Sequence, residues 1–262
     1  MRDAQSDRRR WFGRLSVSAG SIAALLLTFP GVAFAAPPPA LAGSAPSADR
    51  SYQPALDYDG DGCYPTPAIG SNGVIAPGLD LGGALNGHCR DAWDLDNTNA
   101  YSRTKCNSGW CAHLYALYFE KDQALPGSGI GGHRHDWEHV VVWVPDGGQP
   151  QYVSASAHGD YHIRSRDDVA WEADGTHPRI VYHKDGISTH AFRFAGFDEQ
   201  PENHAGTWQY PPLVGWDGYP SGFRDRLTQA DFGSAQLGIR DSSFAHELSK
   251  AEPGGIPFDP HG

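Results

Sequence analysis

One short segment concentrates ionisable side chains in front of a hydrophobic run. Residues 131–144 are GGHRHDWEHVVVWV, with three histidines and two acids between His133 and His139. HDWEH within it fits H-x-x-E-H, the pattern of inverted zinc metalloproteases. That pattern binds zinc only on a helix, where residues four apart lie about 6 Å from each other. On a strand they lie about 13 Å apart, too far to share one ion.

The residues after the motif favour a strand. The run from Val140 to Val144 is β-branched or aromatic, and the turn sequence PDGG follows it. We therefore predict a strand and interpret the zinc-protease pattern as accidental.

A strand places alternate side chains on opposite faces. His135, Trp137 and His139 are then expected on one face, and Asp136 and Glu138 on the other. Both faces continue with apolar residues, which predicts a buried, central strand. Two carboxylates about 7 Å apart on one face repel each other unless a positive group lies between them.

A metal ion, His133 or Arg134 could supply that positive charge. Asp122 ends the preceding predicted strand and can reach the same place across a hairpin. Three carboxylates and one histidine form an oxygen-rich site that suits Mg²⁺ or Ca²⁺ better than zinc. The alternative is a purely structural pairing of Asp136 and Glu138 with Arg134 or a distant lysine.

A second acidic string, DYDGDG at residues 57–62, matches the first half of a calcium-binding EF-hand loop. Position twelve of that loop would be Ala68 instead of glutamate, and Pro65 and Pro67 interrupt it. We interpret the string as an acidic turn. Four further histidines lie in strand-like segments, and we interpret most of them as strand-end or turn residues: His158, His177, His183 and His190. Three tryptophans lie in loop-rich segments: Trp171, Trp208 and Trp216. We interpret most of these as core residues, although one or two exposed ones could stack on a sugar or lie at a lipid interface.

Residues 1–36 are predicted to be a cleaved export signal. Arg9 and Arg10 precede a moderately apolar run that ends at the small-residue site Ala33-Phe34-Ala35. The arginine pair suggests the twin-arginine route. A membrane anchor is the alternative, but glycine and proline break the run. We expect a secreted, extracellular protein.

The leader's five arginines and two aspartates contribute +3 to the total charge of −11, so the rest carries −14. So acidic a surface argues against nucleic-acid binding.

Residues 37–55 are rich in Pro, Ala and Ser and predict a linker with nothing to bury. Residues 56–262 are enough for a single domain.

Four cysteines in an exported chain predict two disulfides. Three pairings are possible, and we favour Cys63–Cys89 with the local pair Cys106–Cys111. A zinc site is the alternative, but the usual ligand spacings are absent.

Many short strands separated by Gly/Pro turns predict an antiparallel β-sandwich with a few peripheral helices. Residues 58–90 are expected to form loops and short strands. The clearest strand patterns cover residues 111–120, 135–144, 150–159, 179–186 and 189–196, and the helical patterns cover 223–230 and 243–251.

The heptapeptide GHRHDWE resembles the hallmark of the necrosis-inducing proteins, the Nep1-like or NPP1 family. It comprises Gly132, His133, Arg134, His135, Asp136, Trp137 and Glu138. Similar segments continue along the chain: YALYFEKD, VVVW, SASAHG, GTHPRIVY, THAFRF, LVGWDGYP and DFGSA. The resemblance is to a bacterial four-cysteine member, and it implies the disulfide Cys63–Cys89.

The family resemblance implies a β-sandwich similar to actinoporins and fungal lectins. It implies a secreted, monomeric cytolysin that binds sphingolipid headgroups of plant plasma membranes, the glycosyl inositol phosphoryl ceramides. It also implies a Ca²⁺ or Mg²⁺ site at Asp122, His133, Asp136 and Glu138. One departure is the segment QALPGSGIGG between Asp122 and His133, which is longer than is usual in the family.

Our leading hypothesis is therefore lipid-headgroup binding without turnover, so we do not expect an enzyme. A metal-assisted phosphodiesterase or glycosidase is the second hypothesis, with Glu138 or His133 as the base. A non-toxic glycan-binding lectin is the third.

Overall fold

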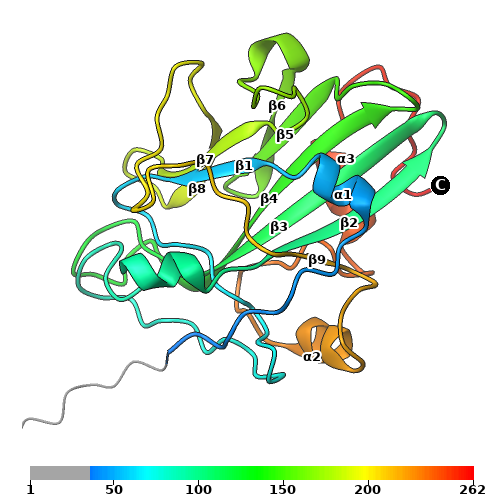
Figure 1. Cartoon of the computed structure of the whole chain (residues 1–262). Coiled ribbons are helices and arrows are strands. Elements are labelled where there is room, and N and C mark those ends of the chain that lie inside the picture. The colour runs from blue at the N-terminus through cyan, green and yellow to red at the C-terminus, as the bar shows by residue number, and fades with distance from the viewer. Residues whose placement is uncertain (1–35) are drawn as a thin grey trace, which may run out of the picture. The chain divides into compact units, whose positions relative to one another are not determined.

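A computed structural model describes residues 36–262, so the predicted export signal lies outside the described residues except for Ala36. Two sheets form the described part (Figure 1), one with the strand order β6-β5-β4-β3-β2-β9 and one with the order β1-β7-β8. The strands are β1 Ala55–Tyr58, β2 Ala100–Asn107, β3 Trp110–Asp122, β4 His133–Pro145, β5 Tyr152–Ala157, β6 Asp160–Ser165, β7 Arg179–Lys184, β8 His190–Phe194 and β9 Leu213–Gly215. The helices are α1 Ser47–Ser51, η1 Ala92–Asp96, η2 Arg166–Asp168, α2 Phe223–Gln229 and α3 Phe244–Ala251.

The two longest strands, β3 and β4, form the centre of the large sheet. They pair antiparallel from Trp110 opposite Pro145 to Asp122 opposite His133. Their alternating residues are apolar on both faces, as expected for a strand covered on both sides. The strand prediction for the HDWEH segment is confirmed, and the helical zinc-protease interpretation is excluded.

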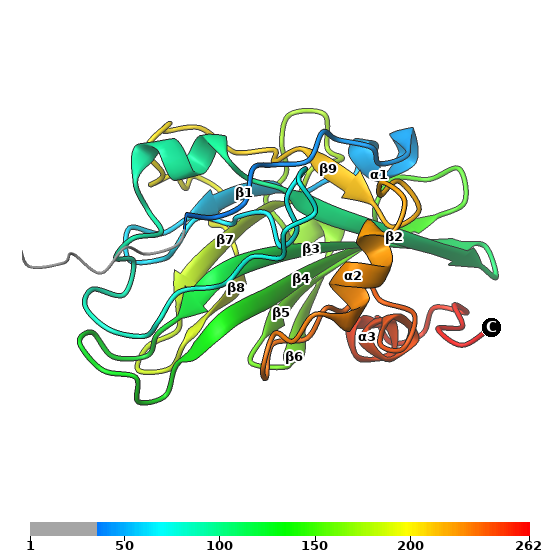
Figure 2. The ribbon, with the colours of Figure 1, turned by 90° about the horizontal axis from the view of Figure 1, so that it is seen from below.

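Each face of the large sheet has its own core. Between the sheets, Phe119 and Val140 pack with Tyr182 of β7 and Phe192 of β8. On the opposite face, Trp143 belongs to a second buried cluster that includes residues of α2 and α3. Figure 2 shows these two helices beside the large sheet and apart from β7 and β8. The predicted β-sandwich with few helices is confirmed.

Two strand pairs differ from the expected antiparallel arrangement. β1 pairs parallel with β7, and β2 pairs parallel with β9. Both pairings join segments far apart in the chain, so no hairpin pattern could reveal them. β1, β2, β6 and β9 were not among the strand patterns identified in the sequence.

The segment 37–55 is not a linker with nothing to bury, which corrects that expectation. Leu41 and Ala45 are buried, and α1 places Asp49 at 3% exposure. Asp49 accepts hydrogen bonds from Ser102 Oγ at 2.6 Å and Thr104 Oγ1 at 2.7 Å. A buried carboxylate needs such donors, so this segment belongs to the packed domain.

Both expected disulfides form in the structure, Cys63–Cys89 and Cys106–Cys111. The second bridges paired residues of the β2–β3 hairpin. The first closes the loop-rich segment after β1, where little regular hydrogen bonding restrains the chain. Within residues 36–262 no helix has the length and apolarity needed to cross a membrane.

Candidate functional site

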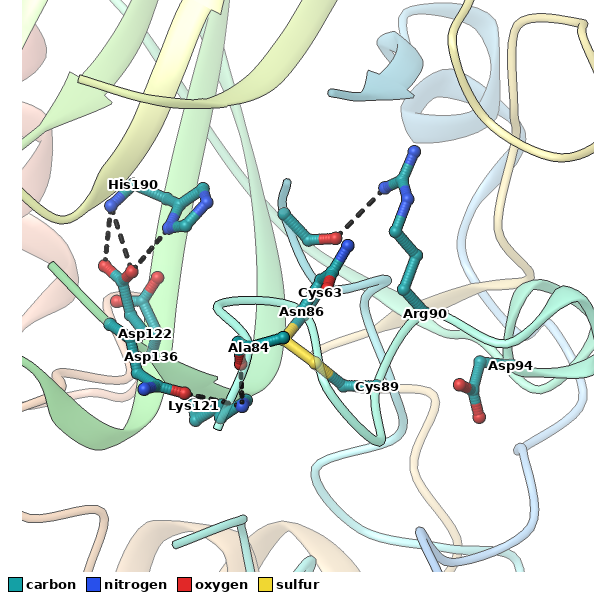
Figure 3. The surroundings of a disulfide bond; sticks show 12 residues. Cys63, Ala84, Asn86, Cys89, Arg90, Asp94, Lys121, Asp122, Asp136 and His190 are labelled. Carbon is teal, nitrogen blue, oxygen red and sulfur yellow. Dashed lines mark hydrogen bonds and ion pairs between the residues drawn. A yellow bond between two sulfur atoms is a disulfide. The ribbon is translucent and has the colours of Figure 1, made fainter. Parts of the chain in front are cut away.

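Three of the four predicted metal ligands meet where β3 ends and β4 begins. Ligand atoms of Asp122, His133 and Asp136 all lie within 4.8 Å of one another, a group that could hold a metal ion. Both aspartates are buried, and the His133 side chain is 32% exposed. Figure 3 shows the two carboxylates beside one another near the Cys63–Cys89 disulfide. The long loop does not displace Asp122, which stays opposite His133 in the strand register.

His135 explains how His133 and Asp136 come to the same side of β4. Residues three apart on a regular strand point to opposite faces. His135, which lies between them, has a φ of 64°, in the left-handed region that interrupts regular alternation. Its ring packs beside Tyr118, whose hydroxyl lies 2.5 Å from His135 Nδ1. This local distortion turns His133 toward the acids.

A backbone contact fixes the tautomer of His133. Its Nδ1 lies 2.7 Å from the carbonyl oxygen of His135, and a carbonyl oxygen only accepts hydrogen bonds. Nδ1 is therefore the donor, which leaves Nε2 as the nitrogen whose lone pair can bind a cation in the neutral ring. Nε2 lies 4.0 Å from Oδ2 of Asp122. A backbone partner of this kind commonly orients a metal-binding histidine.

Asp122 is held by a residue from the small sheet. The backbone N–H of His190 donates to both carboxylate oxygens, at 3.0 and 2.9 Å, and the ring Nδ1 donates to Oδ1 at 2.7 Å (Figure 3). The other ring nitrogen of His190 lies 3.7 Å from Asp61. These bonds hold the Asp122 carboxylate in a fixed orientation.

Asp136 lies deeper and has fewer donors. The Tyr182 hydroxyl donates to it at 3.1 Å, and the Tyr182 ring stacks between Phe119 and His190. Burial, followed by the nearby Asp122 charge, raises the pKa of Asp136 to about 7. A hard cation between the two carboxylates would remove this repulsion and favour their charged forms.

Glu138 lines the same cleft but lies outside the group of three. The cleft has a volume of about 520 Å³ and also contains Asp122, His133 and Asp136 in its wall. The Ser156 hydroxyl donates a short hydrogen bond to Glu138. Burial, and then the charge of Asp136, raises the pKa of the Glu138 carboxyl above its usual range.

The basic partners considered for these acids do not pair with them. Arg134 forms an ion pair with Asp80 instead. Within residues 36–262 no lysine or arginine forms an ion pair with Asp136 or Glu138. Buried carboxylates without a basic partner are costly, and oxygen ligands beside one imidazole fit a hard divalent cation with retained waters.

The acidic string at residues 57–62 does not converge on one point. Asp57 accepts hydrogen bonds from the backbone of Glu202 and from Asn203. Asp59 pairs with Arg193, and Asp61 lies toward His190. The three side chains therefore serve three different contacts, in agreement with an acidic turn.

His190 is the site residue that the sequence analysis missed. It was interpreted as a strand-end histidine, and its position at the start of β8 is as expected. Its bond to Asp122 spans 68 residues, and no sequence pattern pairs β8 with the end of β3. Of the other histidines, His158 pairs with Asp185 at the cleft, and His177 bonds to the Gln53 carbonyl.

The necrosis-inducing protein (NPP1) family model matches residues 47–251. The chain belongs to this family. It is 32% identical over 195 residues to NLP effector protein 10 of Phytophthora capsici, with 73% of this chain and 77% of the relative covered. It is also 32% identical over 196 residues to the necrosis-inducing protein NPP1 of Phytophthora nicotianae, with 73% and 76% covered.

Solved structures of the family share the fold. One, described as a toxin fold for microbial attack and plant defence, has a TM-score of 0.69 at 29% identity and covers 82% of this chain and 97% of that one. A complex of NLPPya with mannosamine has a TM-score of 0.68 at 30% identity, covering 82% and 95%. The non-toxic HaNLP3 protein has a TM-score of 0.69 at 26% identity, covering 82% and 97%.

The chain therefore has the toxin fold of the NLP family. Its relatives are described as necrosis-inducing proteins, effectors and sugar-amine complexes, which supports the expected non-enzymatic character over metal-assisted hydrolysis.

Proposed function

We propose that this protein is a secreted cytolysin that binds sugar-bearing sphingolipid headgroups of plant plasma membranes through a divalent cation. The supporting observation is the buried Asp122, His133 and Asp136 group in the wall of an open cleft. Structures of a relative with mannosamine and glucosamine support a sugar as the ligand.

Asp122, Asp136 and the Nε2 atom of His133 would hold Ca²⁺ or Mg²⁺, with Glu138 as a fourth ligand, directly or through water. The cation supplies positive charge that attracts headgroup hydroxyl or phosphate oxygens. This local charge would offset the repulsion between an acidic protein surface and an anionic headgroup. The chain's own part is to hold the carboxylates in place, Asp122 through the His190 ring and Asp136 through the Tyr182 hydroxyl.

The test is binding to liposomes that contain glycosyl inositol phosphoryl ceramide, with Ca²⁺ and with EDTA. We expect binding and dye release only with the cation, and loss of both in Asp136→Asn and Glu138→Gln. Asp217→Asn is the matched control, because this aspartate is exposed and its one ion pair among residues 36–262 is with Arg224. Unchanged cation-dependent binding by Asp136→Asn with intact folding would refute the proposal.

Non-toxic sugar binding is the second candidate, since the fold similarity includes a solved structure described as non-toxic. Dye release decides between them. Cation-dependent binding to the same liposomes without leakage identifies a lectin, whereas binding with leakage identifies a cytolysin.

A further inference from the structure

A second cleft lies at the other end of β7 from the candidate cation site. It has a volume of about 340 Å³ and is lined by Glu172, Arg179, Gln200, Pro201, Gly206, Thr207, Trp208 and Tyr210. Arg179 begins β7, whereas Lys184 ends it, a length of about 17 Å for six residues in a strand. None of its lining residues lines the cation cleft.

The backbone places Trp208 and Tyr210 on one side of an extended segment. Gln209 between them forms a bridge with Leu56, with backbone hydrogen bonds of 3.0 and 2.8 Å in the two directions. Residues on either side of a bridged residue point the same way. Two aromatic rings therefore line this cleft from a single anchored loop.

Polar groups complete the cleft. Arg179 Nε donates to Glu172 Oε1 at 2.7 Å, and the Arg179 guanidinium lies 5.2 Å from the Trp208 ring centroid. The Trp208 indole N–H, the Tyr210 hydroxyl and the terminal guanidinium nitrogens of Arg179 make no hydrogen bond within residues 36–262. Burial, followed by the carboxylates of Glu172 and Asp174, raises the pKa of Tyr210 to about 12, so the hydroxyl stays a donor.

This combination matches the chemistry of a pyranose sugar. An aromatic face carries negative partial charge that attracts polarised C–H bonds. Hydroxyl groups around a sugar ring need both hydrogen-bond donors and acceptors. The cleft offers the three donor groups of Trp208, Tyr210 and Arg179 beside the Glu172 carboxylate, which accepts. Pockets with few, well-placed polar groups beside aromatic rings are typical ligand sites.

We propose that this cleft is a second, cation-independent site for a neutral hexopyranose, stacked on Trp208 and hydrogen-bonded by Tyr210, Arg179 and Glu172. The sugar would belong to a glycolipid headgroup or a soluble glycan. Two sugar sites on one chain would strengthen binding to multivalent glycan surfaces.

The test is saturation-transfer NMR with methyl glucoside, methyl galactoside and methyl mannoside in EDTA, which removes any cation-dependent binding. We expect at least one glycoside to bind wild type and Asp136→Asn alike. Trp208→Ala should bind about tenfold more weakly, and Tyr210→Phe, which keeps the ring, about fivefold more weakly. Trp93→Ala is the matched control, because Trp93 is 54% exposed and lies outside the cleft.

Two results would overturn this site: absence of EDTA-resistant binding in wild type, or full binding by folded Trp208→Ala and Tyr210→Phe. Loss of cation-dependent liposome binding in Asp136→Asn with sugar binding retained would separate this site from the proposed function. Two further binding measurements in EDTA then identify the source of the sugar. One uses vesicles that contain glucosylceramide, and the other uses soluble cellohexaose. Binding to the vesicles assigns a lipid headgroup, and binding to cellohexaose assigns a soluble glycan.

Discussion

His190 holds Asp122 through its main chain and its ring together. The backbone N–H reaches both carboxylate oxygens, and Nδ1 donates to Oδ1 at 2.7 Å. The His190 ring also stacks on Tyr182, whose hydroxyl donates to Asp136. One histidine of the small sheet therefore contacts the buried Asp122 directly and the buried Asp136 through Tyr182.

His190→Leu is expected to lower cation affinity by about 10- to 100-fold, the usual effect of removing a residue that orients a ligand. Its backbone N–H remains, so Asp122 loses only the ring donor. His190→Asn, whose amide can donate from nearly the same place, should recover part of the affinity. Calorimetric titration with Ca²⁺ measures both, and equal affinity in wild type and His190→Leu would show that the ring donor has no such role.

The conformation of His135 gives a second prediction. A β-branched residue at a φ of 64° is strained, so His135→Val should destabilise the protein by about 1–3 kcal/mol. It should also weaken cation binding, because relaxation to a regular strand turns His133 away from Asp136. His135→Asn tolerates the left-handed region and should retain affinity better. Denaturant unfolding and Ca²⁺ titration of the two variants test this, and better binding by His135→Val than by His135→Asn would contradict it.

Cation should stabilise wild type but not Asp136→Asn, and the variant should be the more stable protein at neutral pH once the cation is removed. Cation at 100 times its dissociation constant adds about 2.7 kcal/mol to the free energy of unfolding of wild type, and Asp136→Asn should lose this gain. In EDTA, the free energy of unfolding of wild type should fall below that of Asp136→Asn as pH rises to 7. The pKa of Asp136 is raised from 3.8 to about 7 in the folded protein, so its favourable contribution is complete below pH 3.8 and is lost as pH rises toward 7.

The amide side chain of the Asp136→Asn variant does not titrate, so it adds no such pH dependence. In EDTA, wild type should therefore lose stability relative to Asp136→Asn between pH 4 and 7. Thermal unfolding of both proteins across this range, with EDTA and with Ca²⁺, is the measurement. If wild type remains more stable than Asp136→Asn at pH 7 in EDTA, the buried pair of carboxylates is not costly.

Asp49 predicts the opposite pH dependence. Burial raises the pKa of this carboxyl, but hydrogen bonds from His113, Ser102 and Thr104 outweigh it, so the pKa lies below the usual 3.8. A lowered pKa stabilises the fold above pH 3.8, and this stability is lost as pH falls through the folded pKa. Asp49→Asn should cost about 1–3 kcal/mol at pH 7. The difference from wild type should shrink below pH 4 in denaturant titrations, whereas a constant difference would exclude a contribution from the charge.

Local sequence determined about half of the elements, including the two central strands, and part of the site. The β-branched run after HDWEH specified a strand, since neighbouring side chains and the PDGG turn act within a few residues. The hairpin between β3 and β4 brought Asp122 opposite His133, because antiparallel neighbours follow each other in the chain. Strict alternation, however, would have separated His133 from Asp136.

Tertiary structure decided what the local pattern could not. The segment 37–55 was expected to be a linker, yet Asp49 finds its donors on β2 and β3, more than fifty residues away. His190 reaches Asp122 only because β8 packs over the large sheet. The left-handed His135 is fixed by packing against Tyr118. Such contacts depend on which distant segments bury each other, and a hydrophobic period along one strand carries no information about its partner in the other sheet.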